Sequence, residues 1–140
     1  MKKNDLFRVM NFTEKSEIIE LSAKIEDRYN VLLLKAPQKM LVMLKVRESA
    51  RNSLFYAGEA LACECLVKLE GNKGFAASLG DDTEKVRAMA VIDAVMNSEL
   101  PERSIVSEAL INWEKVLTAK RAYEARIAMS TKVDFNIMEE

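Results

Sequence analysis

The spacing of apolar residues changes abruptly near position 80, and this change constrains the fold more than any other feature. From Leu61 to Leu69, apolar side chains occupy alternate positions, which is typical of a strand that buries one face. Glu70-Gly71-Asn72-Lys73 predicts a hairpin turn, so 74–79 is expected to return as an antiparallel strand. The acidic residues of 81–84 then predict a helix that runs to about Ser98. We therefore expect antiparallel strands combined with helices.

Two further apolar runs lie earlier in the chain. Val31-Leu32-Leu33-Leu34 predicts a short strand, which Pro37 is expected to end because proline has no N–H group to donate to a ladder. In 39–47, one side carries only apolar residues and the other includes Lys45 and Arg47, which predicts a strand with one buried face. The 140 residues suffice for one hydrophobic core. The sequence thus predicts a single α+β domain over 1–140, with a mostly antiparallel sheet of about four strands.

Helical spacing flanks the expected sheet on both sides. A short helix is expected around 6–10. A second helix contains 18–25, with Asn11 or Thr13 as its cap. After a proline break, an apolar stripe predicts a long helix from about Ser104 to Ser130. The domain is therefore expected to carry N-terminal helices and two C-terminal helices.

Charge and composition exclude several classes of function. With 21 basic and 22 acidic residues, the net charge is −1, and a nucleic-acid-binding protein normally has a basic excess. No apolar run approaches the roughly 20 residues that span a bilayer. The first residues carry basic side chains without a following apolar stretch, unlike a signal peptide. We therefore expect a cytoplasmic protein that binds neither nucleic acid nor a membrane.

Histidine is absent from the chain. This removes the commonest general base near neutral pH and the commonest transition-metal ligand. Neither a Ser-His-Asp nor a Cys-His arrangement can form from this chain alone. Lysine, aspartate, glutamate and tyrosine remain available for acid–base chemistry, so an enzymatic role stays open. We assign no catalytic residue and expect no complete active site.

Cys63 and Cys65 are two residues apart on one expected strand, so they face the same side as Val67 and Leu69. A thiolate metal site would need two further ligands, and the chain contains no other cysteine and no histidine. A disulfide is disfavoured in the cytoplasm. We expect both thiols to be buried in the core, and we expect no metal site.

Three aspartates invite a functional interpretation. Asp81 and Asp82 follow Gly80 and could bind a cation or a substrate hydroxyl, but the same residue types cap helices, and we favour capping. Asp93 interrupts the apolar stripe of the helix that follows, where a carboxylate costs free energy unless it is paired. We expect Asp93 to pair with an internal Arg or Lys or, alternatively, to meet a partner chain.

Eight methionines are many for a chain of this length. Methionine suits irregular cores and interaction surfaces because its side chain is flexible and polarisable. Met40 and Met43 fall on opposite faces of one expected strand, so both faces of the sheet carry apolar side chains. A domain this small cannot cover both faces, which favours a subunit interface.

Several motifs, in order along the chain, resemble the PhnG family, the small subunit of the bacterial carbon–phosphorus lyase system. Phe55-Tyr56-Ala57-Gly58-Glu59-Ala60 resembles its Phe-x-x-Gly-Glu/Asp block, and Gly80-Asp81-Asp82 resembles its Gly-x-Asp pattern. Ala90-Val91-Ile92-Asp93-Ala94-Val95 resembles its Ala-Leu-Ile-Asp-Ala-Leu helix. Thr131-Lys132-Val133-Asp134-Phe135 with Met138 is similar to its Thr-Lys/Arg-Val-Asp-Phe-x-x-Met close.

The chain departs from the family pattern at three places. Cys63-Glu64 stands where Thr-Arg is common, so the charge is reversed. Lys85-Val86-Arg87 stands where His-Ala-Glu is common, and Met40 replaces a usual glycine.

The resemblance implies an assembly with PhnI-like, PhnH-like and PhnJ-like subunits and a PhnL-like ATP-binding subunit. In such an assembly an alkylphosphonate displaces adenine from ATP, which forms a ribose 1-phosphonate 5-triphosphate. A PhnJ-like iron–sulfur subunit later cleaves the carbon–phosphorus bond. ATP would be a substrate of the assembly, and we expect no cofactor on this chain, which lacks the cysteines for a cluster.

Our leading hypothesis is an accessory subunit that packs its sheet and long helix against a PhnI-like partner. One alternative is that the chain is itself a phosphonate ribosyltransferase, with Glu59, Asp82 or Asp93 as acid or electrostatic group. Another is an unrelated cytosolic interaction module or regulatory homo-oligomer. The candidates for contact with a partner or substrate are Phe55, Gly58, Glu59, Gly80, Asp82, Asp93, Val133, Asp134 and Phe135.

Overall fold

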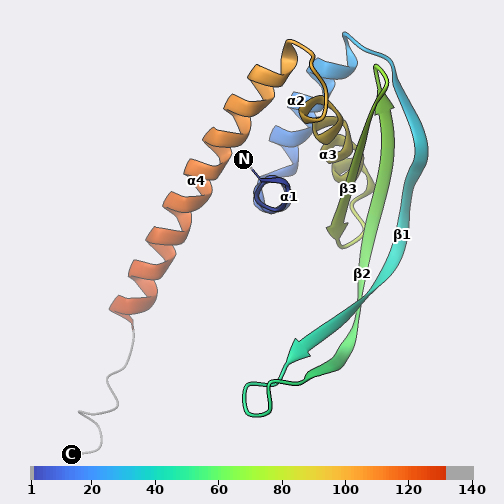
Figure 1. The fold of residues 1–140 in the computed structure, drawn as a ribbon. Coiled ribbons are helices and arrows are strands. Elements are labelled where there is room, and N and C mark those ends of the chain that lie inside the picture. The colour runs from blue at the N-terminus through green and yellow to red at the C-terminus, as the bar shows by residue number, and fades with distance from the viewer. Residues whose placement is uncertain (1, 132–140) are drawn as a thin grey trace, which may run out of the picture.

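The computed structural model describes residues 2–131, and within them the chain has the α+β architecture that the sequence predicts. Two helices come first, three antiparallel strands follow, and two helices close the described chain (Figure 1). The sheet has the order β1-β2-β3, so β2 is central. The elements are α1 (Lys3–Phe12), α2 (Lys15–Glu26), β1 (Val31–Arg47), β2 (Leu54–Leu69), β3 (Asn72–Leu79), α3 (Thr83–Met96) and α4 (Glu102–Ser130).

Helix α3 lies at the centre of the core. It contacts β2 and β3 of the sheet as well as α2 and α4. Residues 88–95 are all buried, which is typical of a helix that is surrounded by other elements. Cys63 and Cys65 of β2 point into this core and are fully buried free thiols, so the expected burial of both side chains is confirmed.

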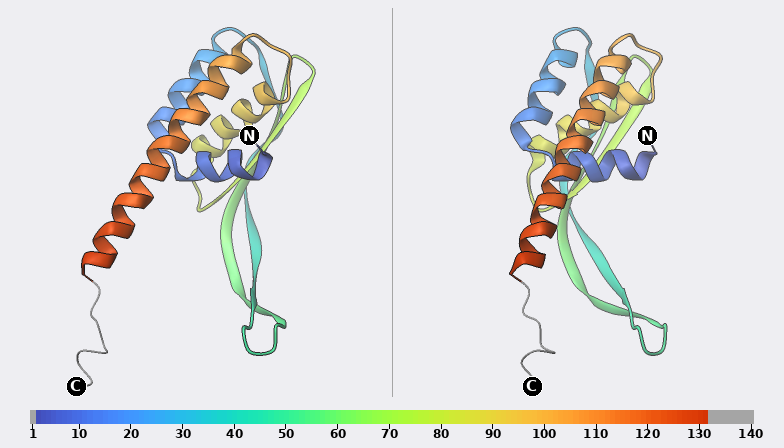
Figure 2. Two further views of the ribbon diagram at one scale, coloured as in Figure 1. Left: turned by 60° about the vertical axis from the view of Figure 1, so that its left-hand side comes forward. Right: turned by 90° about the vertical axis from the view of Figure 1, so that its left-hand side faces the viewer.

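The helices cover only part of the sheet (Figure 1). Strand β3 pairs with β2 from Ala62 to Leu69, whereas β1 and β2 continue together to Arg47 and Leu54. We call residues 41–61 the hairpin arm. The second half of α4, residues 111–130, is here called the helix arm. Both arms project from the body in the same general direction (Figures 1 and 2).

Pro37 does not end a strand as the sequence suggested. The two runs on either side of it form the single strand β1, so the sheet has three strands rather than about four. The register with β2 shifts between Lys35 and Gln38, and Pro37 lies within this irregularity. Because β1 is an edge strand, it tolerates a residue that cannot donate to a ladder at such a point.

The prediction that Asn11 or Thr13 caps α2 is wrong. The residue before α2 is Glu14, whose side chain makes no capping hydrogen bond. Thr13 instead ends α1, where its hydroxyl donates to the Val9 carbonyl at 2.7 Å. Asn11 lies inside α1, and its amide donates to the Phe7 carbonyl at 2.9 Å. Both polar side chains serve the C-terminal end of the first helix because α1 extends further than expected.

Gly74 brings β3 into backbone contact with α3. A Cβ atom at this position would lie 2.1 Å from the Ala90 carbonyl oxygen and 2.4 Å from the Ala94 nitrogen. Both distances are far below van der Waals contact, so only glycine fits without moving the helix or the strand.

We predict that Gly74→Ala lowers the free energy of unfolding by about 3 kcal/mol, because the added methyl group overpacks the contact between β3 and α3. Urea unfolding followed by circular dichroism measures this loss. Gly71→Ala is the matched control: Gly71 has a φ of +83° and open space around it, so only the backbone conformation opposes alanine. That control should cost about 1 kcal/mol. A Gly74→Ala variant as stable as the control would contradict this packing.

Candidate partner interface

One face of the hairpin arm is made entirely of apolar residues and glycine. Cross-strand partners share a face of a sheet. Val42 pairs with Ala60, Leu44 with Gly58 and Val46 with Phe55. Between the last two pairs the register shifts because Ala57 is an extra residue on β2. We call this face the apolar strip; it consists of Val42, Leu44, Val46, Phe55, Gly58 and Ala60.

The apolar strip is exposed within the described chain, with Phe55 at 50% exposure and Leu44 and Val46 close to that value. The sequence predicted that 39–47 forms a strand with one buried face. The alternation is present, but the burial is not, because the helices cover the sheet only beside β3. An exposed apolar strip of this kind is a candidate site of contact with another protein.

The opposite face of the hairpin arm mixes apolar and charged side chains. It pairs Leu41 with Leu61, Met43 with Glu59 and Lys45 with Tyr56. We call it the mixed face. Partial desolvation and then the nearby Glu59 carboxylate raise the pKa of Tyr56, which agrees with both side chains lying on this face.

At the base of the arm, the apolar strip continues into a groove of about 660 Å³ between α1 and the sheet. Met40, Val42 and Leu79 supply its sheet side, and Phe12 and Arg8 belong to its α1 side. Arg8 is held by Asp5 at 3.3 Å and by Glu114 at 3.6 Å. The groove and the strip together form one extended apolar surface.

The helix arm also exposes large apolar side chains. Val116 is 69% exposed and Met129 is 76% exposed, and Tyr123 and Ile127 lie between them. Near the body, the Arg121 guanidinium lies 5.3 Å from the centre of the Phe12 ring. The helix arm is therefore a second surface on which the described chain leaves apolar side chains uncovered.

Asp82 caps α3, as the sequence predicted. Its carboxylate accepts a hydrogen bond from the Lys85 N–H at 3.2 Å and forms an ion pair with Lys15 at 3.0 Å. Burial raises the pKa of Asp82, but the hydrogen bonds from Lys15 and the Lys85 backbone outweigh it, so the pKa is lowered. Gly80 precedes the cap with a φ of +100°. Within residues 2–131 no group of three possible metal ligands occurs at this turn or elsewhere.

Asp93 is paired inside the chain, as expected. It is 1% exposed, and its carboxylate accepts hydrogen bonds from the Phe75 N–H at 3.0 Å and the Asn97 amide at 3.3 Å. Lys3 of α1 reaches the other oxygen at 3.3 Å. The carboxylate therefore links α3 to β3 and α1.

The candidate contact residues do not form one site. Phe55, Gly58 and Glu59 lie on the hairpin arm, and Gly80 and Asp82 form the turn before α3. Asp93 lies 11 residues beyond Asp82, which is about 16 Å along a helix. The remaining candidates, Val133, Asp134 and Phe135, lie outside the described residues.

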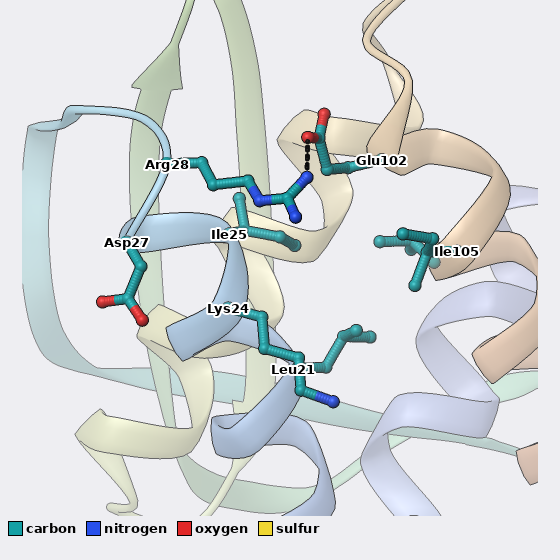
Figure 3. A pocket seen from close by; sticks show the side chains of 8 residues that line it. Leu21, Lys24, Ile25, Asp27, Arg28, Glu102 and Ile105 are labelled. Atoms are coloured by element: carbon teal, nitrogen blue, oxygen red, sulfur yellow. Dashed lines mark hydrogen bonds and ion pairs between the residues drawn. The ribbon is translucent and has the colours of Figure 1, made fainter.

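Sequence reasoning missed a cluster at the start of α4. Glu102 is nearly buried, and its carboxylate accepts from Arg28 at 2.9 Å and from the Tyr29 hydroxyl at 2.7 Å. The Arg28–Glu102 pair lines a cavity of about 290 Å³ whose apolar residues are Leu21, Ile25, Ile105 and Val106 (Figure 3). Glu102 follows Pro101, a common pattern at a helix start, but its partners lie more than 70 residues away in the sequence.

Comparison with known proteins places this sequence in a family. The sequence matches the family described as "Phosphonate metabolism protein PhnG" over residues 1–139. The chain belongs to the PhnG family. It is 31% identical over 118 residues to the alpha-D-ribose 1-methylphosphonate 5-triphosphate synthase subunit PhnG of Rhizobium meliloti (strain 1021), and the match covers 81% of this chain and 73% of that protein. The resemblance read from the motifs is therefore confirmed.

The departures of the chain from the PhnG family pattern have partners inside the molecule. Glu64 accepts hydrogen bonds from Lys35 and Gln38 of β1, so its charge is compensated across the sheet. Lys85 donates to the Asn11 carbonyl at 2.8 Å, and Arg87 lies 2.8 Å from Glu26. Among the described residues of this PhnG-family chain, no helix is long and apolar enough to cross a membrane.

We predict that Asp93→Ala lowers the free energy of unfolding by about 1–3 kcal/mol, because the Phe75 N–H loses its acceptor. Asp93→Asn keeps an acceptor oxygen and should lose less. Asp81→Ala, at an exposed position beside the same helix, should change stability by less than about 0.5 kcal/mol. Chemical denaturation compares the three. Equal losses for Asp93→Ala and Asp81→Ala would show that the Asp93 contacts contribute nothing.

The Glu102 cluster predicts a pH-dependent stability. The Tyr29 hydrogen bond lowers the pKa of Glu102, and Arg28 adds to this against the opposing effect of burial. Because the folded pKa lies below the unfolded one, the stabilisation is present at neutral pH and is lost as the pH falls through the folded pKa. The Tm of the parent chain should exceed that of Glu102→Gln most near pH 7, and the difference should shrink toward about pH 3. A difference that stays constant over this range would refute the assignment.

Proposed function

We propose that the chain is an accessory subunit of an alpha-D-ribose 1-methylphosphonate 5-triphosphate synthase. In this reaction an alkylphosphonate displaces adenine from ATP, and ATP is a substrate of the whole assembly. Membership of the PhnG family supports this chemistry, and the matched Rhizobium meliloti protein carries that name. The structural observation that carries the subunit role is the apolar strip, which the described chain leaves exposed.

The energetics of the hairpin arm favour a bound state. A two-stranded ribbon that packs on nothing is at best marginally stable in water. Leu44, Val46 and Phe55 are each about half exposed, so covering them would contribute about 1 kcal/mol apiece. The groove beside α1 and the helix arm add further apolar area. A partner that covers these surfaces would stabilise the arms and the assembly together.

The proposed partner at the apolar strip is a PhnI-like subunit. PhnH-like and PhnJ-like subunits and a PhnL-like ATP-binding subunit complete the proposed assembly. The chain has no histidine, and two of its three candidate carboxylates serve folding: Asp82 caps α3 and Asp93 links α3 to β3. This favours a division of labour in which the displacement of adenine is housed mainly in a neighbouring subunit.

Release of adenine from ATP and methylphosphonate tests the proposal. We expect release from the purified partner subunits together with this chain, and none from the chain alone. Co-purification of the chain with a tagged PhnI-like subunit gives the parallel measure of assembly. A chain that stays monomeric beside the partners would refute the proposal, and adenine release by the chain alone would show a catalytic protein instead.

Phe55 and Tyr56 offer a matched pair for locating the contact. They are adjacent and almost equally exposed, but Phe55 lies on the apolar strip and Tyr56 on the mixed face. Phe55→Ser should weaken co-purification by at least about tenfold, as expected for a buried aromatic anchor, and Tyr56→Ser should weaken it less. The opposite order would place the partner on the mixed face.

A further inference from the structure

We propose that the hairpin arm binds its partner by strand addition: an extended segment of the partner subunit pairs with the free edge of β2 along residues 54–61. This inference rests on the proposed function, because it specifies how the arm would engage another subunit. It adds a backbone contact to the side-chain contact of the apolar strip.

The end of β3 leaves this edge open. Gly80 donates its N–H to the Leu61 carbonyl at 2.8 Å, and its φ of +100° then turns the chain away toward α3. Within residues 2–131, no strand pairs with this side of 54–60. Backbone groups of alternate residues point to the same edge of a strand. The Leu61 carbonyl points to the β3 side of β2, so the N–H and C=O groups of Glu59 point to the same side. At Glu59 that side is the open edge.

The outer edge of β1 and the open edge of β2 differ in protection. Natural edge strands avoid unwanted pairing through lysine, proline and bulges. Strand β1 carries Lys35, Pro37, Lys39 and Lys45, and its register shifts twice near Pro37. Along 54–61, β2 has no lysine, arginine or proline and only the extra residue Ala57. The open edge of β2 is therefore the one suited to accept another strand.

The side chains beside this edge define the incoming segment. On the apolar strip, Gly58 leaves a gap, because an added Cβ would meet no atom within 4 Å. A large apolar or aromatic residue from the new strand fills such a gap well. On the mixed face, no Lys or Arg within residues 2–131 lies within 4.0 Å of the Glu59 carboxylate, although such pairs form elsewhere in the chain. The partner segment is therefore apolar on one side and carries a Lys or Arg on the other.

A second copy of this chain fits the edge less well. The segment 54–61 of another copy offers no cation to Glu59. This mismatch favours a different polypeptide as the occupant.

Amide hydrogen exchange on the intact wild-type chain, free and in the assembled complex, tests the proposal. We expect the amides of Glu59 and Leu61 to exchange at least about tenfold more slowly in the complex than in the free chain, because they become paired. The outer edge of β1 should gain less protection. Unchanged exchange at 54–61 in a complex that does form would overturn strand addition and leave the proposed function standing.

A proline pair provides the matched variants. Met43 lies directly opposite Glu59, so both backbone N–H groups point to the outer edges of the hairpin, Met43 on the β1 side and Glu59 on the β2 side. Glu59→Pro should weaken binding of the chain to the partner subunits at least about tenfold. Met43→Pro should change it by less than about threefold, and Glu59→Gln tests the charge alone. Equal binding by the two proline variants would contradict the proposal.

Three controls complete the test: the first checks folding, and the other two identify other occupants. The Tm values of the free variants show whether either proline unfolds the arm. Protection of 54–61 that rises with the concentration of the free chain would indicate a second copy. Protection in the free chain that disappears when 132–140 are removed would indicate its own C-terminal segment. Either result would overturn the assignment to a partner subunit.

Discussion

The contact between β3 and α3 organises this molecule. Gly74 allows the two backbones to touch, and in the next residue the Phe75 N–H donates to the buried Asp93 carboxylate. The same carboxylate receives Lys3 from α1. One glycine and one aspartate therefore fix the central helix against the sheet and tie the first helix to both. A charge buried this deeply is stabilising only because its oxygens are satisfied by hydrogen bonds.

The contact between β3 and α3 also determines which parts of the sheet and of α4 stay uncovered. Helix α3 has 14 residues and so spans only about 21 Å, which matches the short β3 but not the 16-residue β2. The outer half of the β1–β2 hairpin extends past the end of α3, and no helix of residues 2–131 packs against it (Figure 2). Helix α4, at 29 residues, likewise outruns the body. The two arms follow from unequal element lengths around one compact core, and their apolar side chains are then available to another protein.

The fold could be predicted wherever a local pattern determines the structure. The alternation around Cys63 and Cys65, the turn at Gly71 and the cap at Asp82 each depend on neighbouring residues, and all three were correct. Errors arose where distant contacts decide. Pro37 is tolerated because β1 lies at the edge of the sheet, a fact of topology that no local pattern contains.

The candidate site was less predictable than the fold for a related reason. Alternation in 39–47 shows that the strand has two different faces, but it does not show whether the same chain covers either of them. The register shift at Ala57 places Phe55 and Gly58 on one face despite their odd spacing, and sequence alone gives no sign of it. The Glu102 cluster depends on two partners in the loop after α2, Arg28 and Tyr29. Its carboxylate is visible in the sequence, but its burial is not.

The segment Phe55 to Ala60 brings these points together. It resembles the Phe-x-x-Gly-Glu/Asp block of the PhnG family, yet within residues 2–131 it packs on little besides its neighbour β1. Glu64, where the chain departs from that family pattern, is instead satisfied internally by Lys35 and Gln38. A charge change at Glu64 is compensated within the chain and needs no matching change in another subunit. Within residues 2–131, a glycine with open space, an exposed phenylalanine and a glutamate on an unpaired edge have no comparable internal role. This agrees with the proposed contact with another polypeptide.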